Sequence, residues 1–190
     1  EDMGADSAAL ATLVWALAQY RFDRYLGDAP SVAPKCLAVP DAVMDAAVAD
    51  AAAVGLVRDL VNTPAEDMGP SALEAAARAL AADHGAEVTT VTGDALRDQG
   101  FPAIHAVGRA ATDAPRLIDR RWGRADAPTL TLVGKGVCFD SGGLNLKPGS
   151  GMRLMKKDMG GAAHVLGLAR RLMAAGVDLR LRVLIPAVEN

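Results

Sequence analysis

Hydrophobic and polar positions follow two different periods along this chain. Apolar residues three and four positions apart predict helices at 7–25, 41–61, 71–84 and 162–175, and a shorter one at 94–99. Alternating or consecutive apolar residues predict strands at 35–39, 87–91, 104–107, 116–122, 129–133 and 179–188. Helices and strands in alternation indicate an α/β fold, with a mainly parallel or mixed sheet flanked by helices.

The last predicted strand bears on where a site would lie. Its residues 183–185 are consecutively apolar, which is typical of a strand buried on both faces. Sites in open α/β sheets lie beyond the carboxyl ends of the strands. The sequence stops at Asn190, where such a loop would begin, so we expect an incomplete domain. A break in the pattern near Pro40 predicts a boundary between residues 1–40 and 41–190.

Composition excludes several classes of protein. Twenty Lys and Arg against 23 Asp and Glu give a net charge of −3, which argues against nucleic-acid binding and against a polybasic membrane surface. Cys36 and Cys138 form no CxxC pair, so neither a disulfide framework nor a zinc knuckle is indicated. Acidic residues precede the apolar stretch 8–17, unlike a secretory signal, and no apolar run is long enough to span a bilayer. We expect a soluble, cytoplasmic protein.

The glycine-rich stretch 133–161 holds the densest chemistry. It places six charged side chains within 24 residues: Lys135, Asp140, Lys147, Lys156, Lys157 and Asp158. Two converging carboxylates repel each other unless a cation lies between them, and carboxylates are ligands for zinc, manganese or magnesium. Lys135 could join them as a neutral amine, while a charged Lys147 could polarise a substrate carbonyl. Spacing alone leaves a metal site and ordinary charges on a glycine-rich surface as alternatives.

The stretch completes none of the other motifs that it partly matches. A phosphate-binding loop needs Ser or Thr after its lysine, but Gly136 follows Lys135. A dinucleotide fingerprint would need glycine where Phe139 stands. The sequence 140–143 is similar to a serine-protease nucleophile loop, but that fold is all-β. There is no HExxH, and the scattered histidines are interpreted as structural: His84, His105 and His164.

Residues 133–147 and 155–163 resemble the leucyl aminopeptidase (cytosol aminopeptidase) family. Residue types and spacings agree over the 31 positions from Val133 to Ala163. Segments 20–25, 62–70 and 184–190 are also similar to that family. The resemblance implies that residues 1–40 are the tail of an N-terminal domain and a linker. Residues 41–190 would be the N-terminal part of a metallopeptidase catalytic domain.

The resemblance also implies a function for each matched residue. The family is a group of metalloaminopeptidases that release N-terminal, leucine-like residues from peptides. They use two divalent metal ions, usually Zn²⁺, with Mn²⁺ or Mg²⁺ in the exchangeable site. By motif match, Lys135 and Asp158 would bind the tighter metal and Asp140 would bridge both. Lys147 would be the catalytic lysine and contact the substrate, and Met155 would line the pocket for its first side chain.

Part of the family's machinery has no counterpart in these 190 residues. A further metal-binding Asp and Glu, and an Arg thought to hold bicarbonate, belong to a loop that follows the strand ending near Asn190. The resemblance therefore predicts an internal fragment without useful peptidase activity alone. Expected partners are peptide substrates and further copies of the chain in a hexamer, with no membrane and no nucleic acid. The alternative is a metal-free, non-catalytic assembly module or pseudoenzyme of the same fold.

Overall fold

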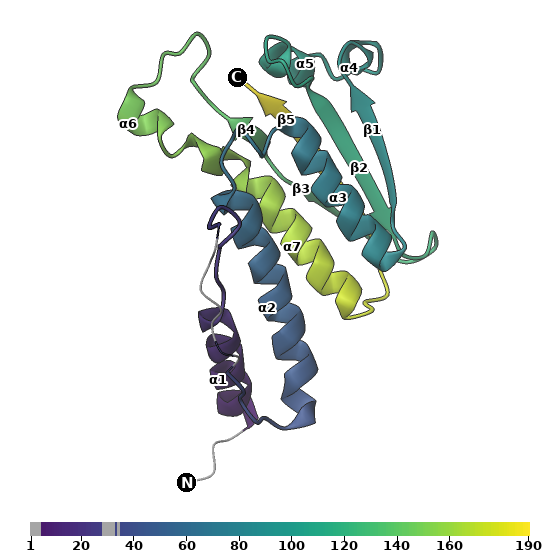
Figure 1. The fold of residues 1–190 in the computed structure, drawn as a ribbon. Coiled ribbons are helices and arrows are strands. Elements are labelled where there is room, and N and C mark those ends of the chain that lie inside the picture. Colours follow the sequence, from purple (N-terminus) through teal and green to yellow (C-terminus); the bar gives the residue numbers. More distant parts are fainter. Residues whose placement is uncertain (1–4, 28–32, 34) are drawn as a thin grey trace.

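Turn residues and prolines set many of the element borders in the computed structural model, which describes residues 5–27, 33 and 35–190 (Figure 1). Pro70 begins a helix, where its missing N–H costs nothing, and Gly85 ends it with a φ of 64°. The elements are α1 (Ala5–Ala18), α2 (Asp41–Asn62), α3 (Pro70–His84), β1 (Glu87–Thr92), α4 (Ala95–Asp98), α5 (Pro102–Gly108), β2 (Arg116–Trp122), β3 (Thr129–Val133), β4 (Gly136–Phe139), α6 (Gly149–Met152), the 3₁₀ helix η1 (Met155–Met159), α7 (Gly160–Ala174) and β5 (Arg180–Glu189).

The five strands form one mixed sheet around β5. The order is β1-β2-β5-β3, and β4 also pairs with β5. β2 runs antiparallel to β1 and β5, whereas β3 and β4 run parallel to β5. The predicted mixed α/β class is therefore confirmed. β3 pairs with residues 180–184 of β5 and β4 with residues 187–189, so residues 134–135 lie between two successive parallel pairings.

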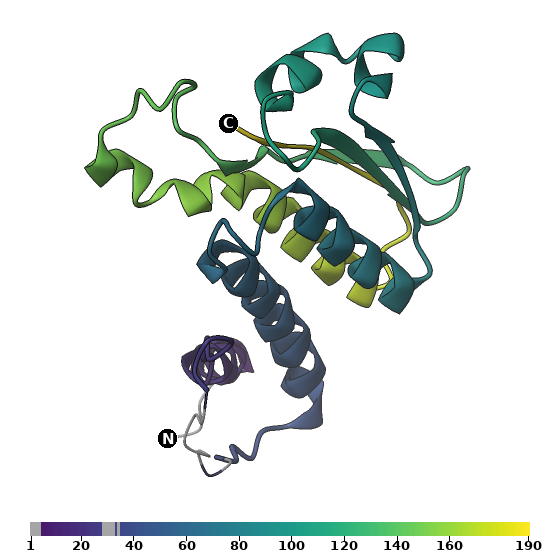
Figure 2. The ribbon, with the colours of Figure 1, turned by 45° about the horizontal axis from the view of Figure 1, so that its top comes forward.

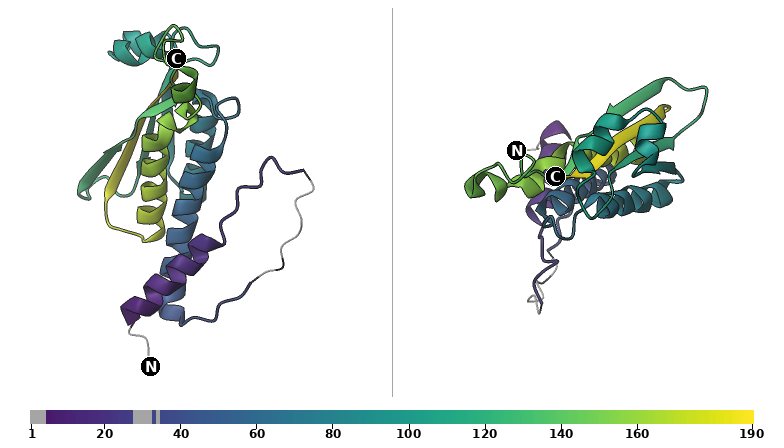
Figure 3. Two further views of the ribbon diagram at one scale, coloured as in Figure 1. Left: turned by 90° about the vertical axis from the view of Figure 1, so that its left-hand side faces the viewer. Right: turned by 90° about the horizontal axis from the view of Figure 1, so that it is seen from above.

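Helices α3 and α7 pack against one face of the sheet, α2 lies on α7, and α1 lies on α2 (Figures 1 and 3). The core fills this interface with small and branched side chains, among them Leu73, Ile118, Leu166, Val183 and Ile185. None of the helices within the described ranges is long and apolar enough to cross a membrane.

Residues 183–185 are not buried on both sides as predicted. Val183 and Ile185 face the helices and are almost fully buried, but Leu184 is half-buried. Neighbouring positions carry charge: Arg182 of β5 binds the Asp119 carboxylate of β2. The far face of the sheet is thus partly polar in the described residues.

Three predicted elements differ from the structure. Residues 104–107 lie in helix α5, not in a strand, because Pro102 occupies the first helical turn and a four-residue segment with three apolar residues fits either period. Residues 35–39 are irregular, and the helix predicted at 7–25 ends at Ala18. The strands predicted at 116–122 and 129–133 are β2 and β3, and β5 lies between them in the sheet.

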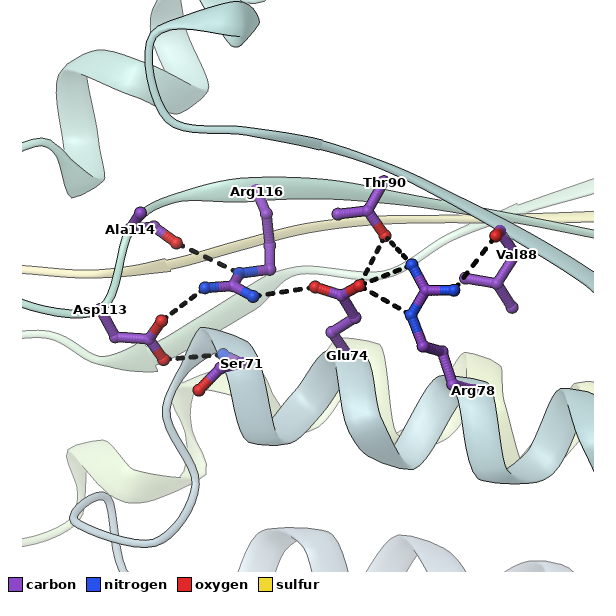
Figure 4. Close-up of polar contacts among 8 residues, drawn as sticks. All are labelled: Ser71, Glu74, Arg78, Val88, Thr90, Asp113, Ala114 and Arg116. Atoms are coloured by element: carbon purple, nitrogen blue, oxygen red, sulfur yellow. Dashed lines mark hydrogen bonds and ion pairs between the residues drawn. The ribbon is translucent and has the colours of Figure 1, made fainter.

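A group of polar side chains joins α3 to β1 and β2 (Figure 4). The Glu74 carboxylate accepts hydrogen bonds from Arg116, Arg78 and Thr90. Arg116 also binds Asp113, whose other oxygen accepts from the Ser71 N–H at 2.7 Å. We call this set the Glu74 cluster; its members are Ser71, Glu74, Arg78, Thr90, Asp113 and Arg116. It fixes the start of α3 over the sheet.

Candidate active site

Lys135 lies at the carboxyl end of β3, where the chain passes close to the start of α7. The preceding Gly134 donates its N–H to Leu184 of β5 at 3.0 Å. The Lys135 carbonyl accepts the N–H of Ala162 at 2.9 Å. The backbone that carries Lys135 is therefore held from the sheet on one side and from the helix on the other.

This close approach requires glycine at Gly161. A Cβ there would lie 2.9 Å from the Lys135 backbone nitrogen, closer than real Cβ contacts come. We expect Gly161→Ala to lower the free energy of unfolding by about 2 kcal/mol, because the added carbon would clash with backbone atoms, which cannot rotate away as a side chain can. The adjacent Gly160 has open space around it, so Gly160→Ala is the matched control. Urea denaturation of both variants checks this; equal losses would contradict it.

Asp158 reaches the same place from η1, directly before α7. Its Oδ2 lies 2.8 Å from the Lys135 Nζ, and its side chain is 14% exposed, against 57% for Lys135. Although the ion pair is close, this oxygen is fully buried and accepts no hydrogen bond from the described residues. A buried carboxylate oxygen needs a cation beside it, and the Lys135 ammonium is the partner that the described residues give to this one.

Asp140 follows β4, and the loop after it is fixed to the end of β5. Ser141 donates its N–H to the Asn190 carbonyl at 2.9 Å, and Asn190 donates back to the Phe139 carbonyl at 3.1 Å. The Lys147 ammonium binds Asp140 Oδ2, and the Gly142 N–H donates to Oδ1 at 2.8 Å. The hydrogen bond from Lys147, and then that from Gly142, hold the pKa of Asp140 below its usual value.

Lys147 also contacts Met155, the residue predicted to line a substrate pocket. Its Nζ lies 3.3 Å from the Met155 Sδ. The loop reaches this position through left-handed backbone at residues 142–145, which includes the non-glycine residues Leu144 and Asn145. Such conformations are uncommon outside glycine and are held only where surrounding bonds fix them.

All five residues predicted for the site thus lie in one cluster. Two ion pairs form it, Lys135–Asp158 and Lys147–Asp140, with Met155 against the second. The charge of Lys135 contributes to the lowered pKa of Asp140, so the two pairs are electrostatically linked. The buried Asp158 oxygen fits a metal ion. The described residues hold no group of three His, Cys, Asp or Glu side chains suited to a metal.

Sequence reasoning missed one feature beside the cluster. A hollow of about 660 Å³ is lined by acidic side chains and Phe139, and it includes none of the five predicted residues. Its carboxylates are Glu66, Asp67, Asp113 and Glu189. We place the site at the ion pairs, because there the charged groups contact one another and one fully buried carboxylate oxygen has only the Lys135 ammonium beside it.

The fold and the cluster define an open α/β protein whose candidate site lies at the carboxyl ends of parallel strands. Residues 55–190 match the catalytic domain of the cytosol aminopeptidase family. A probable cytosol aminopeptidase of Syntrophotalea carbinolica is 42% identical over 92% of this chain and 38% of its own length. The chain therefore belongs to the cytosol aminopeptidase family.

Solved structures agree with this assignment. The cytosol aminopeptidase of Coxiella burnetii is 50% identical, with a TM-score of 0.91 over 97% of this chain and 40% of that one. The bottromycin maturation enzyme BotP, solved in complex with Mn, is 37% identical, with a TM-score of 0.87 over all of this chain and 42% of that one. The chain spans about two fifths of the length of these relatives.

Proposed function

We propose that this chain contributes part of the catalytic domain of a metal-dependent aminopeptidase that releases leucine-like N-terminal residues from peptides. The observation that carries the proposal is the buried Asp158 oxygen, which accepts no hydrogen bond from the described residues yet lies 2.8 Å from Lys135 Nζ. Family membership supports a peptidase, and a relative solved with Mn supports a divalent metal.

Two carboxylates and one amine would hold the metal ions. Asp140 and Asp158 supply oxygen ligands, and Lys135 supplies nitrogen when its amine is neutral, a set that suits Zn²⁺ or Mn²⁺, with Mg²⁺ as the harder alternative. When bound, such ions supply an acidic water and polarise a carbonyl group. Further ligands, and bicarbonate as a possible base, would come from outside these 190 residues.

Lys147 and Met155 would receive the substrate. The Lys147 ammonium can donate to the oxygen of the scissile carbonyl, where negative charge develops during attack. Asp140 holds that ammonium in place, and the Gly142 N–H orients Asp140. Because Met155 touches Lys147, an apolar wall lies next to the cationic group. A leucine-like side chain against Met155 would bring its own carbonyl toward Lys147.

The whole protein would act on peptides in the cytoplasm, in keeping with the family name of its relatives. It would do so as a homo-oligomer. The chain alone would be inactive, because its described residues supply only part of a ligand set.

Chelation tests the proposal. The complete natural polypeptide that carries this chain is treated with EDTA, dialysed, and assayed on leucine p-nitroanilide with and without added Zn²⁺ or Mn²⁺. We expect activity to be lost and then restored by metal, and the isolated chain to stay inactive. Activity that survives chelation would refute the metal-dependent mechanism. A complete polypeptide that is inactive with every metal, yet assembles, would favour a non-catalytic assembly module.

A further inference from the structure

A lysine outside the predicted site joins η1 to the end of α2. The Nζ of Lys156 donates to the carbonyl oxygen of Asn62 at 2.8 Å, across 94 positions of sequence, and the contact is partly buried. The last carbonyls of a helix have no partner within it and carry partial negative charge. A lysine ammonium at this point therefore satisfies an acceptor and complements the helix dipole.

The acceptor belongs to a fixed part of the molecule. The Asn62 amide donates to the Tyr20 hydroxyl at 3.2 Å, and that hydroxyl donates to Asp59 at 2.8 Å. The fully buried Thr63 closes the helix by donating its hydroxyl to the Asp59 carbonyl at 2.7 Å. The end of α2 can thus serve as a rigid support for whatever binds it.

Helix α2 is in turn tightly packed on α7. A Cβ at Gly167 of α7 would lie 2.5 Å from a Val57 methyl carbon of α2, so only glycine allows this approach. Since η1 runs directly into α7, the support and the segment it holds are parts of one packed unit (Figure 2).

The geometry of η1 places its side chains on three sides. A 3₁₀ helix has about three residues per turn, so residues three apart share a side. Met155 and Asp158 therefore face the same way, toward Lys147 and Lys135 respectively. Lys156 points to a second side, toward α2, while Lys157 is exposed. Rotation of η1 about its axis would move Met155 and Asp158 together.

We propose that Lys156 is a positioning residue, whose bond to the end of α2 sets the rotation of η1. This bond fixes Asp158 against Lys135 and Met155 against Lys147 at the same time. The inference rests on the proposed function for its consequences: metal affinity depends on the placement of Asp158, and substrate affinity on that of Met155. Lys156 itself contacts neither metal nor substrate.

The test compares Lys156→Met, Lys156→Arg and Lys157→Met in the complete natural polypeptide. Lys156→Met removes the donor but keeps the apolar stem, Lys156→Arg keeps a donor, and Lys157→Met removes the same charge from the exposed side. We expect Lys156→Met to weaken Mn²⁺ binding about tenfold, as loss of a group that orients a ligand does. It should raise KM for leucine p-nitroanilide and speed amide hydrogen exchange at residues 155–159. Lys156→Arg should recover most of each effect, and Lys157→Met should show none.

Equal behaviour of Lys156→Met and Lys157→Met would overturn the inference. So would a Lys156→Arg variant as impaired as Lys156→Met. If the unmodified protein has no metal-dependent activity, the proposed function fails, and hydrogen exchange alone decides the positioning role. Faster exchange at residues 155–159 that is confined to the Lys156→Met variant supports that role. Unchanged exchange in this variant refutes it. If Lys156→Met does not fold, Lys156→Gln, with a shorter neutral donor, enters the same comparison.

Discussion

Asp158→Asn in the complete natural polypeptide is expected to lower kcat/KM for leucine p-nitroanilide about a thousandfold, since metal catalysis contributes several kcal/mol and each 1.4 kcal/mol is tenfold. The substitution keeps the shape of the side chain and removes its negative charge. It disturbs no hydrogen bond to Oδ2 from the described residues, because that atom accepts none. The pair with the largely exposed Lys135 is worth about 1 kcal/mol or less. A large loss of activity with a small loss of stability therefore marks a metal ligand.

Asp126→Asn is the control for this experiment. Asp126 is 80% exposed and pairs only with the exposed Arg124 among the ion pairs of the described residues, so its removal should leave kcat/KM and metal content unchanged. Metal content, measured on the purified proteins, should fall in Asp158→Asn alone. If Asp158→Asn kept its metal and its activity, the carboxylate would not be a ligand. If its loss of activity came with an equally large loss of stability in urea, the carboxylate would be structural.

Local signals were enough to predict much of the fold. The helix expected at 41–61 is α2, Asp41–Asn62, because Pro40 and Pro64 bound a continuous helical period. The position of Lys135 was also predictable, because the strand expected at 129–133 ends just before it and sites lie at the carboxyl ends of such strands. Asp140 follows β4, a short strand that the sequence analysis did not predict.

Long-range packing decides what these signals miss. Three of residues 104–107 are apolar, as in a short strand, and Pro102 and the packing of α5 on β5 select the helix. Arg120 alternates with Asp119 and Arg121 along β2, yet it is 1% exposed, which lowers its pKa to about 10. No local pattern distinguishes this buried arginine from its neighbours. The bond from Lys156 to Asn62 is likewise invisible, because its partners are 94 positions apart.

Arg116→Met is expected to lower the free energy of unfolding by about 2 kcal/mol at pH 7, because it leaves carboxylates of the Glu74 cluster without a buried cation. The Arg116 side chain is 12% exposed and binds Glu74 and Asp113 together. Burial raises the pKa of Glu74, but hydrogen bonds from Arg116, Arg78 and Thr90 outweigh it, so the pKa lies below its usual value. A carboxyl group whose pKa is lower in the folded than in the unfolded protein stabilises the fold. That contribution is complete above the pKa of the unfolded protein, near 4.5, and is lost as the pH falls through the pKa of the folded protein.

The difference between the protein and Arg116→Met should therefore be constant from pH 7 to about 5 and shrink below that, where Glu74 takes up a proton. Without Arg116, fewer hydrogen bonds counter the effect of burial, so the pKa of Glu74 should be higher in the variant than in the protein. The variant should therefore gain stability relative to the protein as the pH falls. Urea denaturation across this pH range measures both effects. Arg121→Met is the control: Arg121 lies on the same strand and binds Asp119, but it is 52% exposed, so its loss should cost under about 1 kcal/mol. A pH-independent difference for Arg116→Met would mean that lost packing, not the charge of Glu74, explains the destabilisation.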